Sequence, residues 1–186
     1  MNCNEATRSA TWHRYPRDRR TIAIHEAGHL VAWLAYGLTA DRLSARMTPC
    51  GTGGAVTRLD ATGQPIGAPG TLDPQHTEAG PVSACFQRLC LQWAAMYCAG
   101  YVAEACLHGV ADRTTGYPQV LAGEPDMKNA VAFVSFGWPP HDNGPLHRAW
   151  QHAGELIAEH WGWVQRVAAE IEQAGHCTGE RALAFR

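Results

Sequence analysis

Apolar side chains recur at steps of three and four through the last part of the chain, over residues 145–174. An α-helix turns once every 3.6 residues, so this spacing places the side chains on one helical face. The stripe consists of Leu146, Trp150, Ala153, Ile157, Trp161, Val164, Ala168 and Ile171. The segment therefore predicts one long amphipathic helix that must bury its stripe against other helices or a sheet.

Three earlier segments predict helices that can supply this surface. Residues 18–36 have helical spacing of apolar residues, 82–108 form a long apolar run, and 125–136 begin at Pro125, a residue favoured in the first helical turn. Residues 42–59 predict one or two short strands around a glycine-rich turn. We therefore expect a mainly α fold with a short β-hairpin or edge strand after the first helix.

The length of 186 residues fits one domain, and 46% apolar residues are enough to build a core. We expect residues 18–186 to form this domain. The polar, arginine-rich residues 1–17 predict a flexible N-terminal arm. Residues 61–81 are rich in Gly, Pro, Thr and Gln and lack periodicity, which predicts a mobile loop.

Charge and composition argue against several classes of partner. The formal net charge of −2 indicates neither a nucleic-acid partner nor an anionic membrane. The chain contains no apolar stretch long enough for a transmembrane helix and no signal-peptide core, so we expect a cytoplasmic protein. Its seven cysteines include no CxxC pair. We therefore expect them to remain thiols and to pack as small hydrophobes.

The helix predicted at 18–36 carries the sequence His25-Glu26-Ala27-Gly28-His29, an HExxH motif. Residues four apart lie one turn apart on one helical face, so both imidazoles can reach one metal ion. The carboxylate of Glu26 points to the side of that face, where it can accept a proton from a metal-bound water. Zinc lowers the pKa of such a water from about 15.7 to about 7. The motif therefore predicts a hydrolytic zinc site with Glu26 as the general base.

A catalytic zinc ion normally takes three protein ligands, so one more ligand is needed. The metzincin continuation of the motif requires histidine at position 35, and the chain has Ala35 there. The candidates are carboxylates on later helices, Glu104 and Asp126. Asp126 follows Pro125 in a first helical turn, where the helix dipole favours a carboxylate. Glu104 lies mid-helix among apolar residues, which indicates either a ligand or a carboxylate that orients a ligand histidine.

Residues 25–29 look like the peptidase motif of the FtsH-type ATP-dependent zinc metalloproteases, and other segments agree with that family in order. The resemblance runs from about residue 21 to residue 186, apart from 61–81. It implies zinc ligands His25, His29 and Asp126, with Glu104 outside the ligand set. It is carried by residues 25–29, 42–58, 99–104 with Gly109, 114–116, Asp126 with Ala130, and 178–180.

The resulting expectation is a zinc metallopeptidase, a hydrolase that acts on unfolded or peptide substrates. The strand near 54–59 is a candidate to pair with an extended substrate. No GxxxxGK[ST] loop occurs in the 186 residues, so we expect activity independent of ATP. The sequence leaves open whether a separate ATPase or a homo-oligomer takes part. The alternatives are a zinc-containing binding or regulatory module with little or no protease activity, and a zinc hydrolase that acts on another substrate.

Overall fold

The computed structural model describes residues 18–48, 54–59, 65–66, 83–109, 121, 123–139 and 142–186. The predicted arm at 1–17 and residues 114–116 lie outside this part of the chain. The described part is mainly helical, which confirms the predicted fold class. Its elements are α1 (Arg19–Ala35), the 3₁₀ turn η1 (Ala40–Arg42), β1 (Leu43–Met47), β2 (Gly54–Leu59), β3 (Pro65–Ile66), α2 (Ala84–Leu107), α3 (Pro125–Gly137), α4 (Gly144–Glu159), α5 (Trp161–Ala174), β4 (His176–Thr178) and α6 (Gly179–Leu183).

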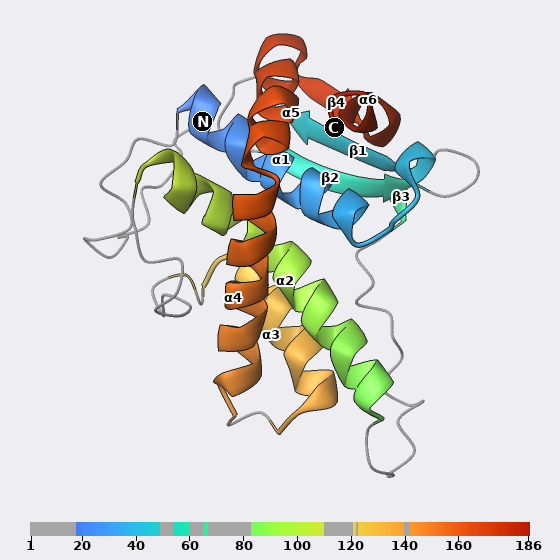
Figure 1. Ribbon diagram of the computed structural model, residues 1–186, viewed down its shortest axis with the longest axis vertical. Coiled ribbons are helices and arrows are strands. Elements are labelled where there is room, and N and C mark those ends of the chain that lie inside the picture. The colour runs from blue at the N-terminus through green and yellow to red at the C-terminus, as the bar shows by residue number, and fades with distance from the viewer. Residues whose placement is uncertain are drawn as a thin grey trace, which may run out of the picture.

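Helix α1 is the centre of the fold. Its first turn is capped by the side chain of Asp18, which accepts a hydrogen bond from the Thr21 amide at 2.8 Å. Every residue from Thr21 to Leu34 is buried, because α2, α5, β1 and β2 all contact this helix. Figure 1 shows α2, α3 and α4 together in the lower part of the molecule and the sheet with α5 and α6 above. Residues on several faces of α1 are therefore shielded from solvent.

Helices α1 and α2 approach each other closely at Gly28. A Cβ atom at this position would lie 2.7 Å from the Ala99 carbonyl oxygen and 2.8 Å from the Ala103 Cβ. Any larger side chain would therefore push the two helices apart. The absence of a side chain at Gly28 lets the backbone of α2 lie directly against the helix that carries the HExxH motif.

The sheet is antiparallel, with strand order β3-β2-β1-β4. Strands β1 and β2 form the predicted hairpin, with Leu43 opposite Arg58 and Met47 opposite Gly54. Strand β4, which the sequence did not predict, pairs with the other side of β1. Strand β3 lies inside the segment 61–81. The sequence predicts a mobile loop for this segment, and apart from Pro65 and Ile66 the segment lies outside the described residues.

The single helix predicted over 145–174 is wrong at one point, because the chain forms two helices that meet at His160 (φ −106°, ψ 17°). The two halves of the apolar stripe pack on different partners: α4 contacts α2, and α5 contacts α1. Gly162, a poor helix former, follows the break. The indole Nε1 of Trp163 then donates to the Ala182 carbonyl at 2.7 Å, which ties α5 to α6.

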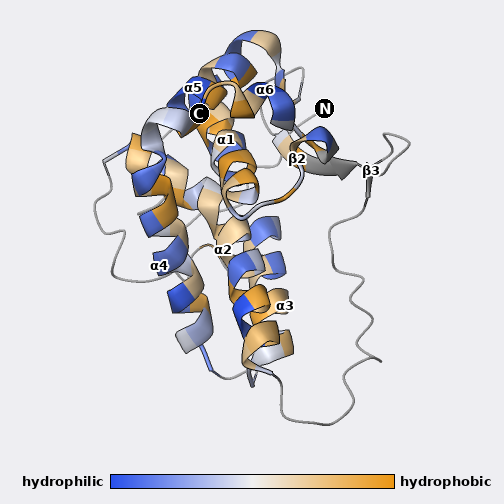
Figure 2. Ribbon diagram, turned by 45° about the vertical axis from the view of Figure 1, so that its right-hand side comes forward, coloured by the Kyte–Doolittle hydropathy of each residue, from blue (hydrophilic) through white to orange (hydrophobic). Residues whose placement is uncertain are grey.

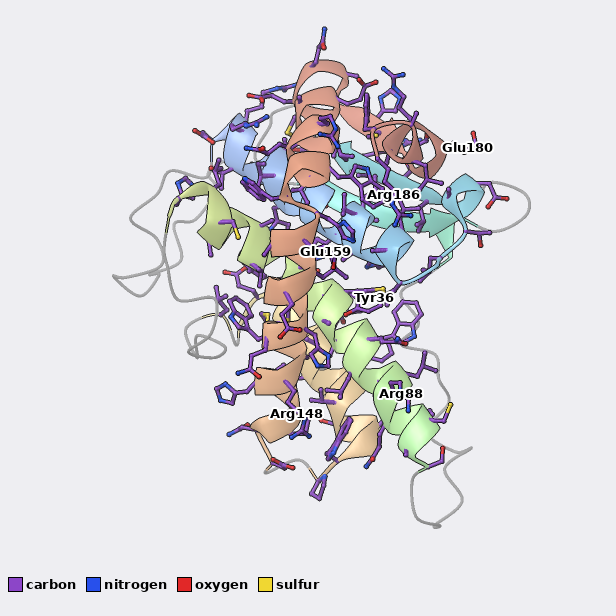
Figure 3. All side chains as sticks on the ribbon, viewed as in Figure 1. Tyr36, Arg88, Arg148, Glu159, Glu180 and Arg186 are labelled. Carbon is purple, nitrogen blue, oxygen red and sulfur yellow. The ribbon has the colours of Figure 1, made fainter. Side chains whose placement is uncertain are left out.

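Hydrophilic and hydrophobic residues alternate along α4 and α5, as expected for helices with one buried face (Figure 2). The labelled charged side chains Arg88, Arg148, Glu159 and Glu180 lie on the outside of the molecule (Figure 3). None of the described helices is both long enough and apolar enough to cross a membrane.

Candidate metal centre

Three predicted site residues meet at one point. His25 and His29 lie one turn apart in α1, with ring centroids 4.7 Å apart, and their Nε2 atoms are separated by 3.0 Å. The Asp126 Oδ2 atom, from the first turn of α3, lies 3.2 Å from the His25 Nε2 and 3.3 Å from the His29 Nε2. Among the residues that the structure describes, this is the group of His, Cys, Asp and Glu side chains arranged to hold a metal ion.

The outer nitrogens of the two rings fix where their protons lie. The His29 Nδ1 is 2.8 Å from the Met96 carbonyl oxygen, which only accepts, so the His29 Nδ1 carries the proton and donates. The His25 Nδ1 lies 2.6 Å from the Glu104 Oε1, which also accepts. In the neutral rings, both Nε2 lone pairs therefore face the Asp126 carboxylate. Three acceptors that converge in this way call for a cation between them.

The spacing of the three atoms fits zinc. In a tetrahedral zinc site with bonds of about 2.0–2.1 Å, neighbouring ligand atoms lie about 3.3 Å apart. The observed separations of 3.0, 3.2 and 3.3 Å are close to this value. Two imidazoles and one carboxylate leave a fourth corner of the tetrahedron for water or substrate, as catalytic zinc sites require.

The structure separates the two candidate carboxylates. Asp126 reaches the Nε2 atoms of both histidines, whereas Glu104 contacts the outer nitrogen of His25. A carboxylate on the outer nitrogen of a ligand histidine fixes the orientation and tautomer of the ring. Asp126 is therefore the carboxylate that could complete a metal site with the two histidines, and Glu104 lies behind His25.

The contacts between His25, His29, Asp126 and Glu104 also shift the pKa values of His25 and Asp126. Burial disfavours the His25 imidazolium, but hydrogen bonds to Asp126 and Glu104 outweigh burial and raise the pKa of His25 to about 10. Burial would raise the pKa of Asp126, but His29 and His25 hold it well below its ordinary value. Without a metal ion, the centre therefore keeps a proton to compensate its negative charge.

Glu26 is buried, with 5% of its surface exposed, and lies outside the three-atom group. The start of β2 lies directly against it: a Cβ on Gly54 would be 2.5 Å from the Glu26 Cγ and 2.7 Å from its Oε1. The hairpin that follows α1 in sequence therefore forms one wall beside the candidate base. The sequence did not predict the contact between Gly54 and Glu26, because this contact depends on how the hairpin folds back.

Two further residues of α2 shape the centre, and the sequence did not predict this role for either of them. A Cβ on Gly100 of α2 would lie 2.5 Å from the His29 Nε2 and 2.7 Å from the His25 Nε2, so glycine leaves room for both ring nitrogens. The Tyr101 ring packs edge-on against His25, with centroids 4.7 Å apart. The Tyr101 hydroxyl donates to the Glu124 Oε2 at 3.3 Å, which links α2 to the start of α3.

No protein-family model and no curated protein matches this chain. The geometry of His25, His29, Asp126 and Glu26 therefore carries the functional argument.

Proposed function

We propose that this chain is a zinc-dependent metallopeptidase that hydrolyses peptide bonds in unfolded proteins or peptides. The observation that carries the proposal is the convergence of two imidazole nitrogens and one carboxylate oxygen at 3.0–3.3 Å, beside the buried carboxylate of Glu26. The resemblance of residues 25–29 to the FtsH-type peptidase motif supports the same assignment. A zinc ion held only for structure would need no carboxylate base beside it.

Each residue has a distinct part in this proposal. His25, His29 and Asp126 would hold the zinc ion, which when bound acidifies water and polarises a carbonyl group. Glu26 accepts a proton from the attacking water and then delivers it to the leaving amine. Glu104 and the Met96 carbonyl keep the two imidazole rings in place through their outer nitrogens.

The sheet offers a way to hold an extended substrate. Within the described residues, β3 pairs only with Arg58 and Leu59 of β2. The same side of β2 over residues 54–57 has no strand beside it in this part of the chain. An extended peptide could pair there with β2 through main-chain hydrogen bonds. Because Gly54 at the start of β2 lies against Glu26, such a peptide would lie next to the proposed base. Strand addition requires an unfolded segment, which is why we propose unfolded or peptide substrates.

The test combines metal analysis with a peptide-cleavage assay. Purified protein should contain one zinc ion per chain and cleave an unstructured fluorogenic peptide without added nucleotide, and a chelator should abolish cleavage. The Glu26→Gln variant should keep its zinc and lose activity by at least about a hundredfold. Zinc retained with no cleavage by the wild type would contradict the peptidase proposal and favour a binding or regulatory module or a zinc hydrolase that acts on another substrate.

A further inference from the structure

Two buried hydrogen-bond donors near the metal centre have no partner among the residues that the structure describes: the indole Nε1 of Trp33 and the hydroxyl of Tyr97. The side chains belong to residues that are only 4% and 5% exposed. Their rings meet edge to face, with centroids 6.3 Å apart. A buried polar group without a partner is costly, so two of them in one cluster point to an acceptor that binds there.

Both residues belong to helical turns next to those that carry the metal centre. Trp33 is one helical turn after His29 on α1. Tyr97 directly follows Met96, whose carbonyl accepts from His29, and precedes Tyr101 by one turn of α2. Burial and then the negative charge of Asp126 raise the pKa of Tyr97 to about 12, so its hydroxyl keeps its proton at neutral pH.

Aromatic rings pack against the rings of both side chains. Tyr97 and Trp93 both stack on Phe133 of α3, with centroid separations of 5.7 and 5.5 Å, and Trp93 packs edge-on against Trp33 at 5.9 Å. Trp93 is only half-buried, so the cluster extends toward the surface.

The two donors, the nearby charge of Asp126 and the aromatic rings together favour one kind of ligand atom. Two donors disfavour a cation, and the charge of Asp126 disfavours an anion. A neutral acceptor next to an apolar group fits both the donors and the aromatic rings.

We propose that Trp33 and Tyr97 form a subsite beside the metal centre that binds a peptide carbonyl oxygen, with an adjacent apolar side chain held by the aromatic rings. The assignment of a peptide as the ligand rests on the proposed function. In catalysis the subsite contributes to substrate binding, so its loss raises KM and leaves kcat nearly unchanged.

The direct test uses N-acetyl-phenylalanine methylamide, a neutral probe with two carbonyl groups and an apolar ring. It is titrated into the full chain in the Glu26→Gln background, with and without zinc, while the indole N–H resonance of Trp33 is followed by NMR. That resonance is assigned by its loss in Trp33→Phe. We expect a saturable downfield shift, and a two- to tenfold weaker affinity in Tyr97→Phe, the change expected for one hydrogen bond.

The matched control is Tyr36→Phe, which removes a hydroxyl at the C-terminal end of α1 (labelled in Figure 3) and should leave probe binding unchanged. Thermal unfolding gives a second readout. Because Tyr97→Phe removes a buried donor without a partner, its melting temperature should stay the same or rise. A lower melting temperature with unchanged probe affinity would assign Tyr97 a packing role and overturn the proposal.

Failure of this subsite is distinguishable from failure of the proposed function. If the chain binds no zinc and cleaves no peptide, the peptidase proposal fails, and the titration of the metal-free protein still decides the subsite. If cleavage depends on zinc and Glu26 while Tyr97→Phe leaves KM unchanged, only the subsite is wrong.

Discussion

Gly100→Ala tests whether the two ring nitrogens form a metal site, because the new methyl group would occupy the space beside them. Its Cβ would lie 2.5 Å from the His29 Nε2 and 2.7 Å from the His25 Nε2. A carbon atom normally lies about 3.5 Å from such a neighbour, so each ring must move by roughly 0.8–1 Å. Zinc–ligand distances tolerate about 0.2 Å.

The expected effect on zinc binding is larger than the effect on folding. Moving the rings also disturbs the 2.8 Å bond to Met96 and the 2.6 Å bond to Glu104. Loss of such supporting contacts alone costs about 10–100-fold in metal affinity, so with displaced rings we expect a loss of at least about 100-fold, or roughly 2.7 kcal/mol. Overpacking costs about 1–3 kcal/mol, and replacing helical glycine by alanine returns about 1 kcal/mol. The metal-free variant should thus be destabilised by only about 0–2 kcal/mol.

The assay is competition for zinc against a chromophoric chelator, together with thermal unfolding with and without zinc. At the same zinc concentration, zinc should raise the melting temperature of the wild type more than that of Gly100→Ala. Gly162→Ala is the matched control, because among the described residues a Cβ there meets only the tip of Arg166, at 3.4 Å. This control should bind zinc normally and be slightly more stable. Wild-type zinc affinity in Gly100→Ala would refute the reasoning.

Three further outcomes are expected. Asp126→Asn should abolish stoichiometric zinc binding, whereas Glu104→Gln should weaken it by about 10–100-fold, both measured by chelator competition. Gly54→Ala should keep zinc but lower peptide turnover at least about tenfold, because its Cβ displaces the Glu26 carboxylate. In the metal-free protein, the raised pKa of His25 adds stability that is fully present below pH 6.5 and lost as the pH rises through about 10. Because zinc must displace this proton, zinc affinity should increase across the same pH window.

The sequence predicted those features that depend on local helical spacing. The helix around the HExxH motif, the long helix before Gly109, the start of the third helix at Pro125 and the hairpin near residues 42–59 all appear in the structure. Spacing within one helix was enough to direct His25 and His29 toward one point. It was not enough to choose between two carboxylates on later helices, because that choice depends on how α2 and α3 pack.

The features that the sequence did not predict depend on contacts between distant segments. Strand β4 pairs with the side of β1 that β2 does not occupy. The break at His160 occurs where the helix that packs against the apolar stripe changes from α2 to α1. The donors of Trp33 and Tyr97 likewise look like ordinary core residues in the sequence. Their lack of partners becomes visible only when the neighbouring helices are in place.

The same helix pair builds both the core and the candidate metal centre. Gly28 lets the backbone of α2 approach α1, and this approach brings the Met96 carbonyl to His29 and the Glu104 carboxylate to His25. These two acceptors fix the protons on the outer ring nitrogens, so in the neutral rings both Nε2 lone pairs are directed at Asp126. The packing of α2 thus gives the two histidines the tautomers and orientations that a metal site needs, because a helix carrying the same motif alone would leave both undetermined.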